Sequence, residues 1–306
     1  MLDRRQLLTG VVGGLLGGPL TGIALPRPAL AQQPGVTALS SRVALVTAGR
    51  TNVLALTTPD GLVVVDSGAP DLVEPLMAAL RPLGRVSTVF NTHFHPENTG
   101  GNEALRQAGA AIVAHENTRL WMATPTWLPT EDRYRQPRPK GAHPTKTFYI
   151  DGSMQPAGER IDYGYLIEAH TSGDVYVFFR DSNVLAVGDV ASPARDPELD
   201  YLTGAWIGGR ADALARLVDL AGPETKIVPG FGPVMTRAQL QAERDLMKAI
   251  YDRTVDRVRE GDSAEDMLEG GVLNGLARTL TDPHKFLYDV HKGLWAHHNK
   301  LSPNVV

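Results

Sequence analysis

Two histidines, His93 and His95, stand directly after positions 86–90, a run of β-branched and aromatic residues that predicts a buried strand. Side chains two positions apart share one face of an extended chain, so both imidazoles are expected to point to the same side. Imidazole and carboxylate groups are the donors that zinc, iron and related divalent ions prefer. A His-x-His pair alone is weak evidence for a metal site, because many exposed loops carry one. It does indicate a fold in which a strand ends at a polar site.

Three further segments place polar or glycine-bearing sequence directly after predicted strands. His170 follows one strand and Asp189 follows another, while the turn at positions 229–233 follows a third. Open α/β folds build a single crevice from residues at successive strand ends. These positions are therefore expected to converge with His93 and His95 at one edge of the fold.

Apolar periodicity predicts strands and helices in alternation along the chain. The predicted strands span residues 43–46, 53–57, 62–65, 86–90, 111–114, 175–179, 183–187 and 226–228. The predicted helices span residues 72–80, 116–122, 211–220 and 237–259, with one more from Glu103 and a C-terminal helix from Asp282. Residues 124–145 carry five prolines and several charges, which favours a surface insertion or lid. This order of elements would suit two sheets between helices.

The composition narrows the chemistry and the partners. The 306 residues contain no cysteine, which excludes disulfides, thiolate metal ligands and cysteine nucleophiles. A metal site in this chain must use histidine, carboxylate or neutral oxygen donors. The formal net charge of −4 is too small to indicate a nucleic-acid partner. An ordinary globular protein without a nucleic-acid partner is therefore the expectation.

The first 31 residues have the features of an export signal. Arg4 and Arg5 resemble a twin-arginine signal, and they precede a stretch too rich in glycine to be a stable membrane span. The stretch ends at Ala29-Leu30-Ala31, the small-x-small pattern typical of signal-peptidase cleavage. We predict that residues 1–31 are a signal peptide for the twin-arginine export machinery, and that residues 32–306 are one periplasmic or otherwise exported domain. A basic cytosolic N-terminus is the alternative.

In the order and spacing of these blocks, the chain resembles the metallo-β-lactamase-fold superfamily of metallohydrolases over about residues 43–260. His93 and His95 match the first two ligands of that family's His-x-His-x-Asp-His signature, and His170 matches its third histidine ligand. Asp189 matches the carboxylate that bridges two metal ions. The resemblance implies an α/β fold, a four-layer αββα sandwich, with a metal site at the shared edge of its two sheets.

The chain departs from the family pattern at the second metal site. Glu97 and Asn98 stand where the signature has Asp-His, and Phe231 stands where the last loop normally presents a histidine. Loss of two imidazoles removes most of the donor strength for a second transition metal. The resemblance therefore implies one divalent ion, zinc foremost with Fe²⁺ or Mn²⁺ as alternatives. The three matched histidines would hold this ion with the matched aspartate nearby, and a second metal would be weakly bound or absent.

The resemblance also implies hydrolysis. Three histidines leave a position for water, and a bound zinc lowers the pKa of that water to about 7. The resulting hydroxide is expected to attack an ester, thioester, lactone or similar substrate, with Glu97 or Asp189 orienting it or accepting its proton. Two other functions stay open. His93, His170 and Asp189 would also suit a mononuclear non-haem iron oxygenase acting on sulfur compounds, and the fold could serve as a non-catalytic periplasmic binding protein.

Overall fold

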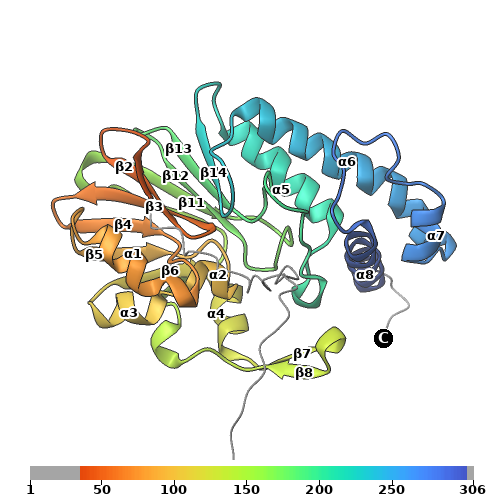
Figure 1. Cartoon of the computed structure of the whole chain (residues 1–306), viewed down its shortest axis with the longest axis horizontal. Coiled ribbons are helices and arrows are strands. Elements are labelled where there is room, and N and C mark those ends of the chain that lie inside the picture. Colours follow the sequence, from red (N-terminus) through yellow and green to blue (C-terminus); the bar gives the residue numbers. More distant parts are fainter. Residues whose placement is uncertain (1–34, 302–306) are drawn as a thin grey trace, which may run out of the picture. The chain divides into compact units, whose positions relative to one another are not determined.

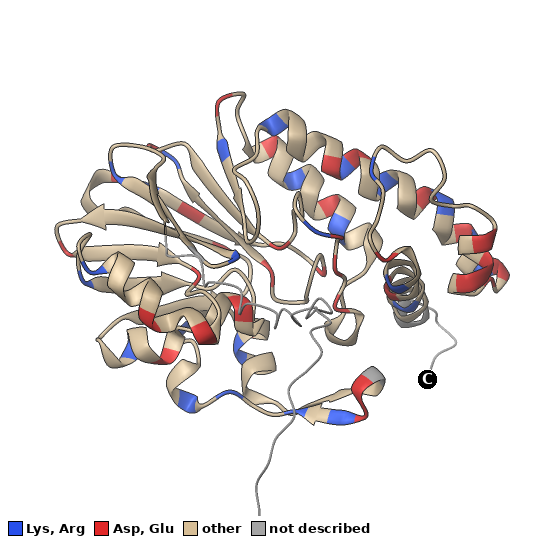
Figure 2. Ribbon diagram, viewed as in Figure 1, with Lys and Arg blue, Asp and Glu red and all other residues tan. Residues whose placement is uncertain are grey.

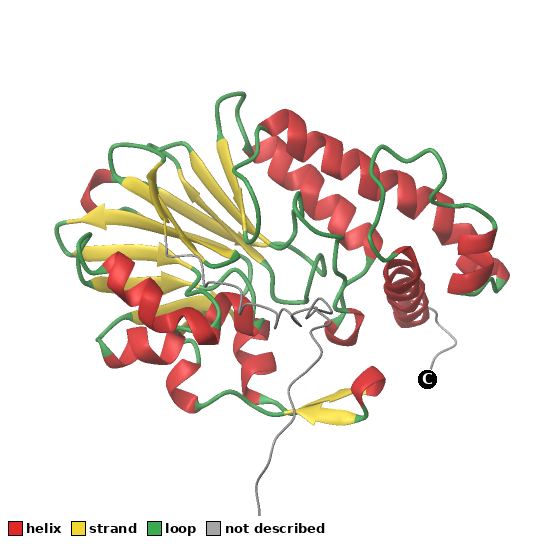
Figure 3. Ribbon diagram, viewed as in Figure 1, coloured by secondary structure: helices red, strands yellow, loops and turns green. Residues whose placement is uncertain are grey.

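Figure 1 shows the computed structural model, which describes residues 35–301; the predicted signal peptide lies outside the described residues. Two β-sheets pack face to face, and helices cover the outer face of each sheet (Figure 1, Figure 3). The predicted αββα sandwich is therefore confirmed.

The first sheet has seven strands and mixes two kinds of pairing. Its strands, in spatial order, are β1 (Gly35–Ala38), β2 (Val43–Ala48), β3 (Thr51–Thr58), β4 (Gly61–Val65), β5 (Val86–Phe90), β6 (Ala111–His115) and β9 (Lys146–Phe148). The strands from β1 to β4 form an antiparallel meander, whereas β4, β5, β6 and β9 run parallel. The carboxyl ends of β4 and β5 therefore lie at the same edge of the sheet.

The second sheet has five strands. In spatial order they are β10 (Asp151–Met154), β11 (Ile161–Tyr165), β12 (Val175–Phe179), β13 (Val184–Gly188) and β14 (Lys226–Pro229). Antiparallel pairing runs from β10 to β13, and β14 pairs parallel with β13, so β11, β13 and β14 end at the same edge. The sequence predicted a strand before His170 but set no bounds for β11, and it did not predict β10, because glycine and aspartate interrupt the apolar alternation of both strands.

Eight α-helices occur among residues 35–301. They are α1 (Val73–Leu80), α2 (Pro96–Thr99), α3 (Asn102–Gln107), α4 (Glu116–Ala123), α5 (Ile207–Leu220), α6 (Arg237–Glu260), α7 (Ala264–Glu269) and α8 (Pro283–Leu301). Helix α6 begins at a capping box, in which Thr236 and Gln239 each bond the other's backbone N–H. It ends at Gly261, whose φ of 98° allows the left-handed turn that stops the helix.

Apolar side chains fill the three spaces between the four layers. Along β4, Val63 and Val65 face the second sheet, while Val64 faces α1, as the two-residue period of a strand requires. Side chains of the second sheet that complete the central layer include Ile161, Val177, Phe179, Val184 and Val228. On the far face of that sheet, Phe178 and Leu185 pack in the same core as α5, α6 and α8. Both sheets are thus buried on both faces near the site.

The predicted insertion, residues 124–145, has two parts. A hairpin of β7 (Thr126–Leu128) and β8 (Arg133–Arg135) extends beyond the two large sheets (Figure 1). The chain then returns to the first sheet, where Ala142 is buried and Thr145 Oγ1 accepts a hydrogen bond from the backbone of Ile112 at 2.9 Å. The second part therefore anchors the hairpin to the domain.

No helix among residues 35–301 is both long and apolar enough to cross a membrane. Charged residues gather on the helices, above all on α6 and α7, and are sparse on the strands of the two large sheets (Figure 2). Acidic and basic side chains alternate along α6, which gives this helix a mixed solvated face.

Candidate metal centre

Loops at the shared edge of the two sheets bring the sequence-predicted residues together. These loops follow β4, β5, β11, β13 and β14 and supply Asp66, His93, His95, His170, Asp189 and Phe231. The ends converge because the strands that precede them run in a common direction within each sheet. Residues that follow separate strands in the sequence therefore lie together in one site.

The imidazoles of His93, His95 and His170 form a compact cluster. Their ring centroids lie 4.7 to 4.8 Å apart, and their planes cross at 83° or 84°. One nitrogen of each ring lies within 4.8 Å of the others, the one such group of potential metal ligands found among residues 35–301. The side chains of His93 and His170 are at most 1% exposed, whereas that of His95 is 12% exposed. Three lone pairs can therefore converge on one ion.

Hydrogen bonds to the outer nitrogens identify the atoms that would hold an ion. His170 Nδ1 lies 2.9 Å from the Glu198 carbonyl, an acceptor, so Nδ1 carries the proton and Nε2 keeps its lone pair. His95 Nε2 lies 3.0 Å from Asp200 Oδ2, and its Nδ1 faces His170 Nε2 at 3.0 Å. His93 Nε2 is buried and has no hydrogen-bond partner among residues 35–301. A buried polar atom left unsatisfied costs about 1–3 kcal/mol, so these residues fit a divalent ion that would satisfy it.

Burial favours the neutral form of two of the three imidazoles. It lowers the pKa of His93 and of His170 well below the ordinary value, and neighbouring charges on the other imidazoles act in the same direction. Burial also lowers the pKa of His95, but the hydrogen bond and charge of Asp200 outweigh it and leave that pKa raised. Neutral imidazole is the form that binds metals, and a carboxylate partner orients a histidine ligand. Asp200 therefore belongs to the site.

Two buried aspartates hold the turns that carry the histidines. Asp66 accepts hydrogen bonds from the backbone N–H and the hydroxyl of Thr92, both at 2.8 Å, next to His93. Asp174 accepts from the backbone N–H of His170 and of the residue after it, both at 2.7 Å. Burial raises the pKa of each aspartate to about 7, and these hydrogen bonds act in the opposite direction. The backbone on both sides of the cluster is thus positioned before any ion binds.

Asp189 lies beside the cluster and already has a cationic partner. Its Oδ2 is 3.7 Å from His93 Nε2 and 3.8 Å from His170 Nε2. The same oxygen accepts a hydrogen bond from Arg195 Nη2. Burial raises the pKa of Asp189 to about 6, and the charge of Arg195 opposes this shift. Asp189 Oδ1 packs over Gly230, where a Cβ would lie 1.9 Å from it, so only glycine fits there.

The residues that depart from the expected ligand pattern differ in their surroundings. Asn98 is fully buried, and its Nδ2 donates to Asp66 Oδ2 at 2.9 Å. The ring of Phe231 lies 3.8 Å from the guanidinium carbon of Arg195. Glu97 is exposed and lines the cavity beside the cluster. Asn98 therefore contacts the buried Asp66 and Phe231 contacts Arg195, whereas Glu97 is open to a substrate.

Arg210, on α5, bonds several points of the loop that follows β13. Its side chain is fully buried, and its Nη1 donates at 2.8 Å to the Glu198 carbonyl that also bonds His170 Nδ1. Its Nη2 donates to the Asp189 carbonyl at 3.0 Å and to Ser192 Oγ at 2.8 Å. One buried cation therefore links the part of this loop that orients His170 to the part that carries Asp189.

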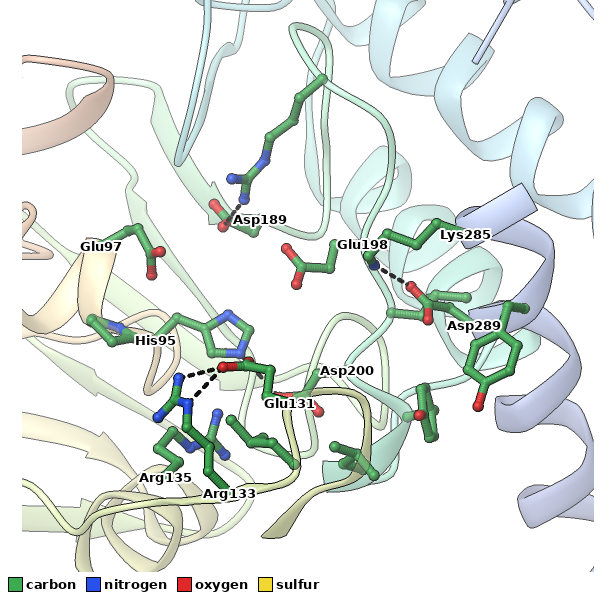
Figure 4. Close-up of a pocket in the computed structure, with 17 residues that line it drawn as sticks. His95, Glu97, Glu131, Arg133, Arg135, Asp189, Glu198, Asp200, Lys285 and Asp289 are labelled. Carbon is green, nitrogen blue, oxygen red and sulfur yellow. Dashed lines mark hydrogen bonds and ion pairs between the residues drawn. The ribbon is translucent and has the colours of Figure 1, made fainter. Parts of the chain in front are cut away.

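A cavity of about 470 Å³ opens beside His95 and Asp189, within the range of roughly 300–1,000 Å³ typical of small-molecule sites (Figure 4). Figure 4 shows the carboxylates of Glu97, Asp189 and Glu198 directed toward one central space. The hairpin of the insertion also lines the cavity, through Leu128, Glu131, Arg133 and Arg135. The predicted insertion thus forms one wall of the site.

Sequence reasoning did not identify Asp174, Asp200, Arg195 or Arg210 as parts of the site. Asp174 follows His170 by four positions, and this short spacing was the one local signal of a shared turn. Asp200 contacts a histidine 105 positions away, which no local pattern reports. Arg210 bonds mainly backbone carbonyls, which every residue possesses, so its partners leave no trace in the sequence.

Comparisons with known proteins identify the family. A sequence model of the metallo-beta-lactamase superfamily matches residues 46–233, more than half of the chain. The metallo-beta-lactamase type 2 of Bacillus cereus is 27% identical over 202 residues, which cover 64% of this chain and 73% of that protein. The hydroxyacylglutathione hydrolase of Rhodospirillum rubrum is 29% identical over 122 residues, which cover 39% of this chain and 40% of that protein.

Solved structures share the fold at lower sequence identity. The metallo-beta-lactamase from Pontibacter korlensis has a TM-score of 0.58 and 23% identity, covering 71% of this chain and 99% of that chain. The DIM-1 metallo-beta-lactamase has a TM-score of 0.56 and 17% identity, covering 71% of this chain and 97% of that chain. The sequence match, the αββα fold and the histidine cluster agree, and the chain belongs to the metallo-beta-lactamase superfamily.

Proposed function

We propose that this protein is a metal-dependent hydrolase of an ester, thioester, lactone or similar small molecule. The observation that supports it is the convergence of three buried imidazoles beside an open cavity. A divalent ion held by His93, His95 and His170, zinc foremost, would supply Lewis acidity and lower the pKa of a water in the site. The related proteins named as a beta-lactamase and a hydroxyacylglutathione hydrolase are both hydrolases, in agreement with this reaction class.

Two carboxylates of the chain have different tasks in this proposal. Asp189 is within 4 Å of two ligand nitrogens, and its bond to Arg195 keeps it an acceptor, which suits it to orient the attacking water. Glu97 reaches the cavity from an exposed position, so it can accept a proton from that water and exchange it with solvent. The walls of the cavity would hold the substrate over both carboxylates.

The experiment that tests this proposal combines metal content with a substrate panel. Full-length protein from its native host would be analysed for zinc, iron and manganese per chain, and then assayed on esters, thioesters and lactones. We expect one zinc per chain and a hydrolytic activity that a chelator removes and zinc restores. Stoichiometric iron with oxygen uptake would favour the sulfur oxygenase, and a metal-replete but inert protein would favour the binding protein.

Replacing Glu97 with glutamine is expected to lower kcat by roughly 100-fold, because an amide cannot accept the proton. The variant should keep its zinc content, since Glu97 is not among the clustered ligands. Steady-state kinetics on the best substrate of the panel would measure the effect. Glu131→Gln is the matched control, because Glu131 lines the same cavity but pairs with Arg133. Unchanged turnover in zinc-loaded Glu97→Gln would remove this residue from the proton-accepting role.

We also propose that the protein acts outside the cytoplasm, in the periplasm or beyond. The adjacent pair Arg4 and Arg5 and the Ala29-Leu30-Ala31 pattern support export through the twin-arginine machinery. That route carries folded proteins and so would suit a metal loaded before export. Fractionation of cells that express the full chain tests this, and a protein that stays cytoplasmic at full length would contradict it.

A further inference from the structure

The carboxylate of Asp189 has a fixed cation beside it. Arg195 Nη2 donates to Asp189 Oδ2, the oxygen that faces the histidine cluster. The aspartate is 4% exposed and the arginine side chain 33% exposed, so solvent screens the pair less than it would at the surface. Guanidinium stays protonated at any physiological pH, which makes this a permanent positive charge.

Aromatic packing holds the guanidinium in this position. Its central carbon lies 3.8 Å from the centroid of the Phe231 ring, a distance at which a cation is attracted to the ring face. A Cβ at Gly232 would lie only 2.6 Å from the Cβ of Ala194, so the segment before Arg195 packs closely on the loop that carries Phe231. The two loops therefore form one unit around the cation.

A buried acid also anchors the backbone of this segment. Glu243, on α6 and 7% exposed, accepts a hydrogen bond from the backbone N–H of Ser192 at 3.1 Å. Its other oxygen lies 3.3 Å from Arg278 Nη1, and Arg278 Nη2 donates to the backbone carbonyl of Arg195. Hydrogen bonds to Glu243 and from Arg278 therefore hold the backbone of residues 192–195, from which the Arg195 side chain extends.

The other side chains on this face of Asp189 offer little to a second metal ion. Asp189 Oδ1 and Asn98 Nδ2 both approach the same point over Gly230, at 1.9 Å and 3.2 Å from a Cβ placed there. The Asn98 nitrogen is bonded to Asp66, and Phe231, the residue after Gly230, has no metal-binding atom. The buried oxygens on this face that are left without a hydrogen-bond partner among residues 35–301 are Asn98 Oδ1, a neutral amide oxygen, and Asp189 Oδ1, and no imidazole accompanies them. A metal ion on this face of Asp189 would also be repelled by the positive charge of Arg195.

We propose that Arg195 fills the position a second metal ion would need beside Asp189, and so limits the site to the single ion held by the three histidines. This inference rests on the proposed metal site and adds the residue that sets its stoichiometry. The guanidinium neutralises the buried carboxylate in place of a metal, and its charge repels a further ion. Phe231 then packs against the guanidinium, rather than being an incidental loss of a ligand.

The test restores donors to this face with and without the arginine. The double variant Asn98→His, Phe231→His places two imidazoles beside Asp189, and the triple variant adds Arg195→Ala. Each protein is loaded with excess zinc, separated by gel filtration and analysed for zinc per chain. We expect one zinc in the natural chain, one in the double variant and two in the triple variant. Arg133→Ala added to the double variant is the control, because Arg133 lines the same cavity, and it should leave one zinc.

Two results would overturn the proposal. A second zinc in the double variant would show that Arg195 does not exclude it, and a single zinc in the triple variant would show that something else does. Retention of the first zinc in every variant serves as the check that the site has folded. A natural chain that binds no zinc at all would instead contradict the proposed three-histidine site.

A single conservative change supplies an independent measurement. Arg195→Gln keeps a hydrogen-bond donor for Asp189 but removes the positive charge near the ion. The first zinc is then expected to bind at least about tenfold more tightly, because repulsion is lost and the carboxylate charge is no longer offset. Competition with a chromophoric chelator measures this affinity. Unchanged or weaker zinc binding would mean that Arg195 merely positions Asp189.

Discussion

Replacing His170 with alanine is expected to release the bound ion and to lower turnover more than about 100-fold, the upper end of the loss when only a partner of a metal ligand is removed. The alanine leaves two imidazoles and an Asp189 carboxylate already bonded to Arg195, which is a much weaker donor set. The buried Asp174 would still hold the backbone of the turn, so the fold should persist. Zinc per chain and turnover would be measured on one preparation.

A surface histidine is the matched control for this prediction. The side chain of His284 is 58% exposed and pairs with Glu265 at 3.0 Å, away from the cluster. His284→Ala is expected to keep one zinc per chain and full activity. If His170→Ala retained zinc with unchanged affinity, the ion would have to bind elsewhere and the three-histidine site would be wrong.

Replacing Arg210 with methionine is expected to lower the free energy of unfolding by about 3–5 kcal/mol, because hydrogen bonds from a buried charged group contribute about 1.5–3 kcal/mol each. Methionine fills much of the volume but removes the guanidinium's hydrogen bonds to the carbonyls of Glu198 and Asp189. Because the Glu198 carbonyl also orients His170, zinc affinity should fall together with stability. Urea unfolding of the zinc-free protein separates the first effect from the second.

A second arginine of α5 tests whether the burial of Arg210 causes the expected loss of stability. Arg216, on α5, is exposed and donates to the Tyr165 carbonyl at the surface. Arg216→Met is expected to change the free energy of unfolding by less than about 1 kcal/mol, as for other exposed interactions. Equal losses for the two variants would assign the effect to the helix rather than to the buried contacts of Arg210.

Local pattern was sufficient for the parts of the fold that bury continuous apolar runs. The predicted strands at 62–65, 86–90 and 175–179 coincide with β4, β5 and β12, each flanked by turn residues. Strand β10 was missed and the bounds of β11 were not predicted, because each contains a glycine and depends on pairing with its neighbour, β10 with β11 and β11 with β12. Tertiary pairing there overrides a weak local preference.

Within the site, too, some residues could be predicted from local sequence and others could not. His93, His95, His170 and Asp189 could be proposed from the sequence, because each follows a strand and strand ends meet at one edge. The sequence could also show that Asn98 and Phe231 are poor ligands, since this depends on their functional groups alone.

Only the tertiary structure decided what replaces those ligands and what holds the site together. Arg195 meets Phe231 because two loops from different strands pack on each other, and Arg210 reaches from α5 to two backbone carbonyls of the loop after β13. Apolar periodicity reports which face of an element is buried, which is a local property. The partners of a buried charge depend on how distant segments pack together, and that packing depends on the tertiary contacts of the whole domain.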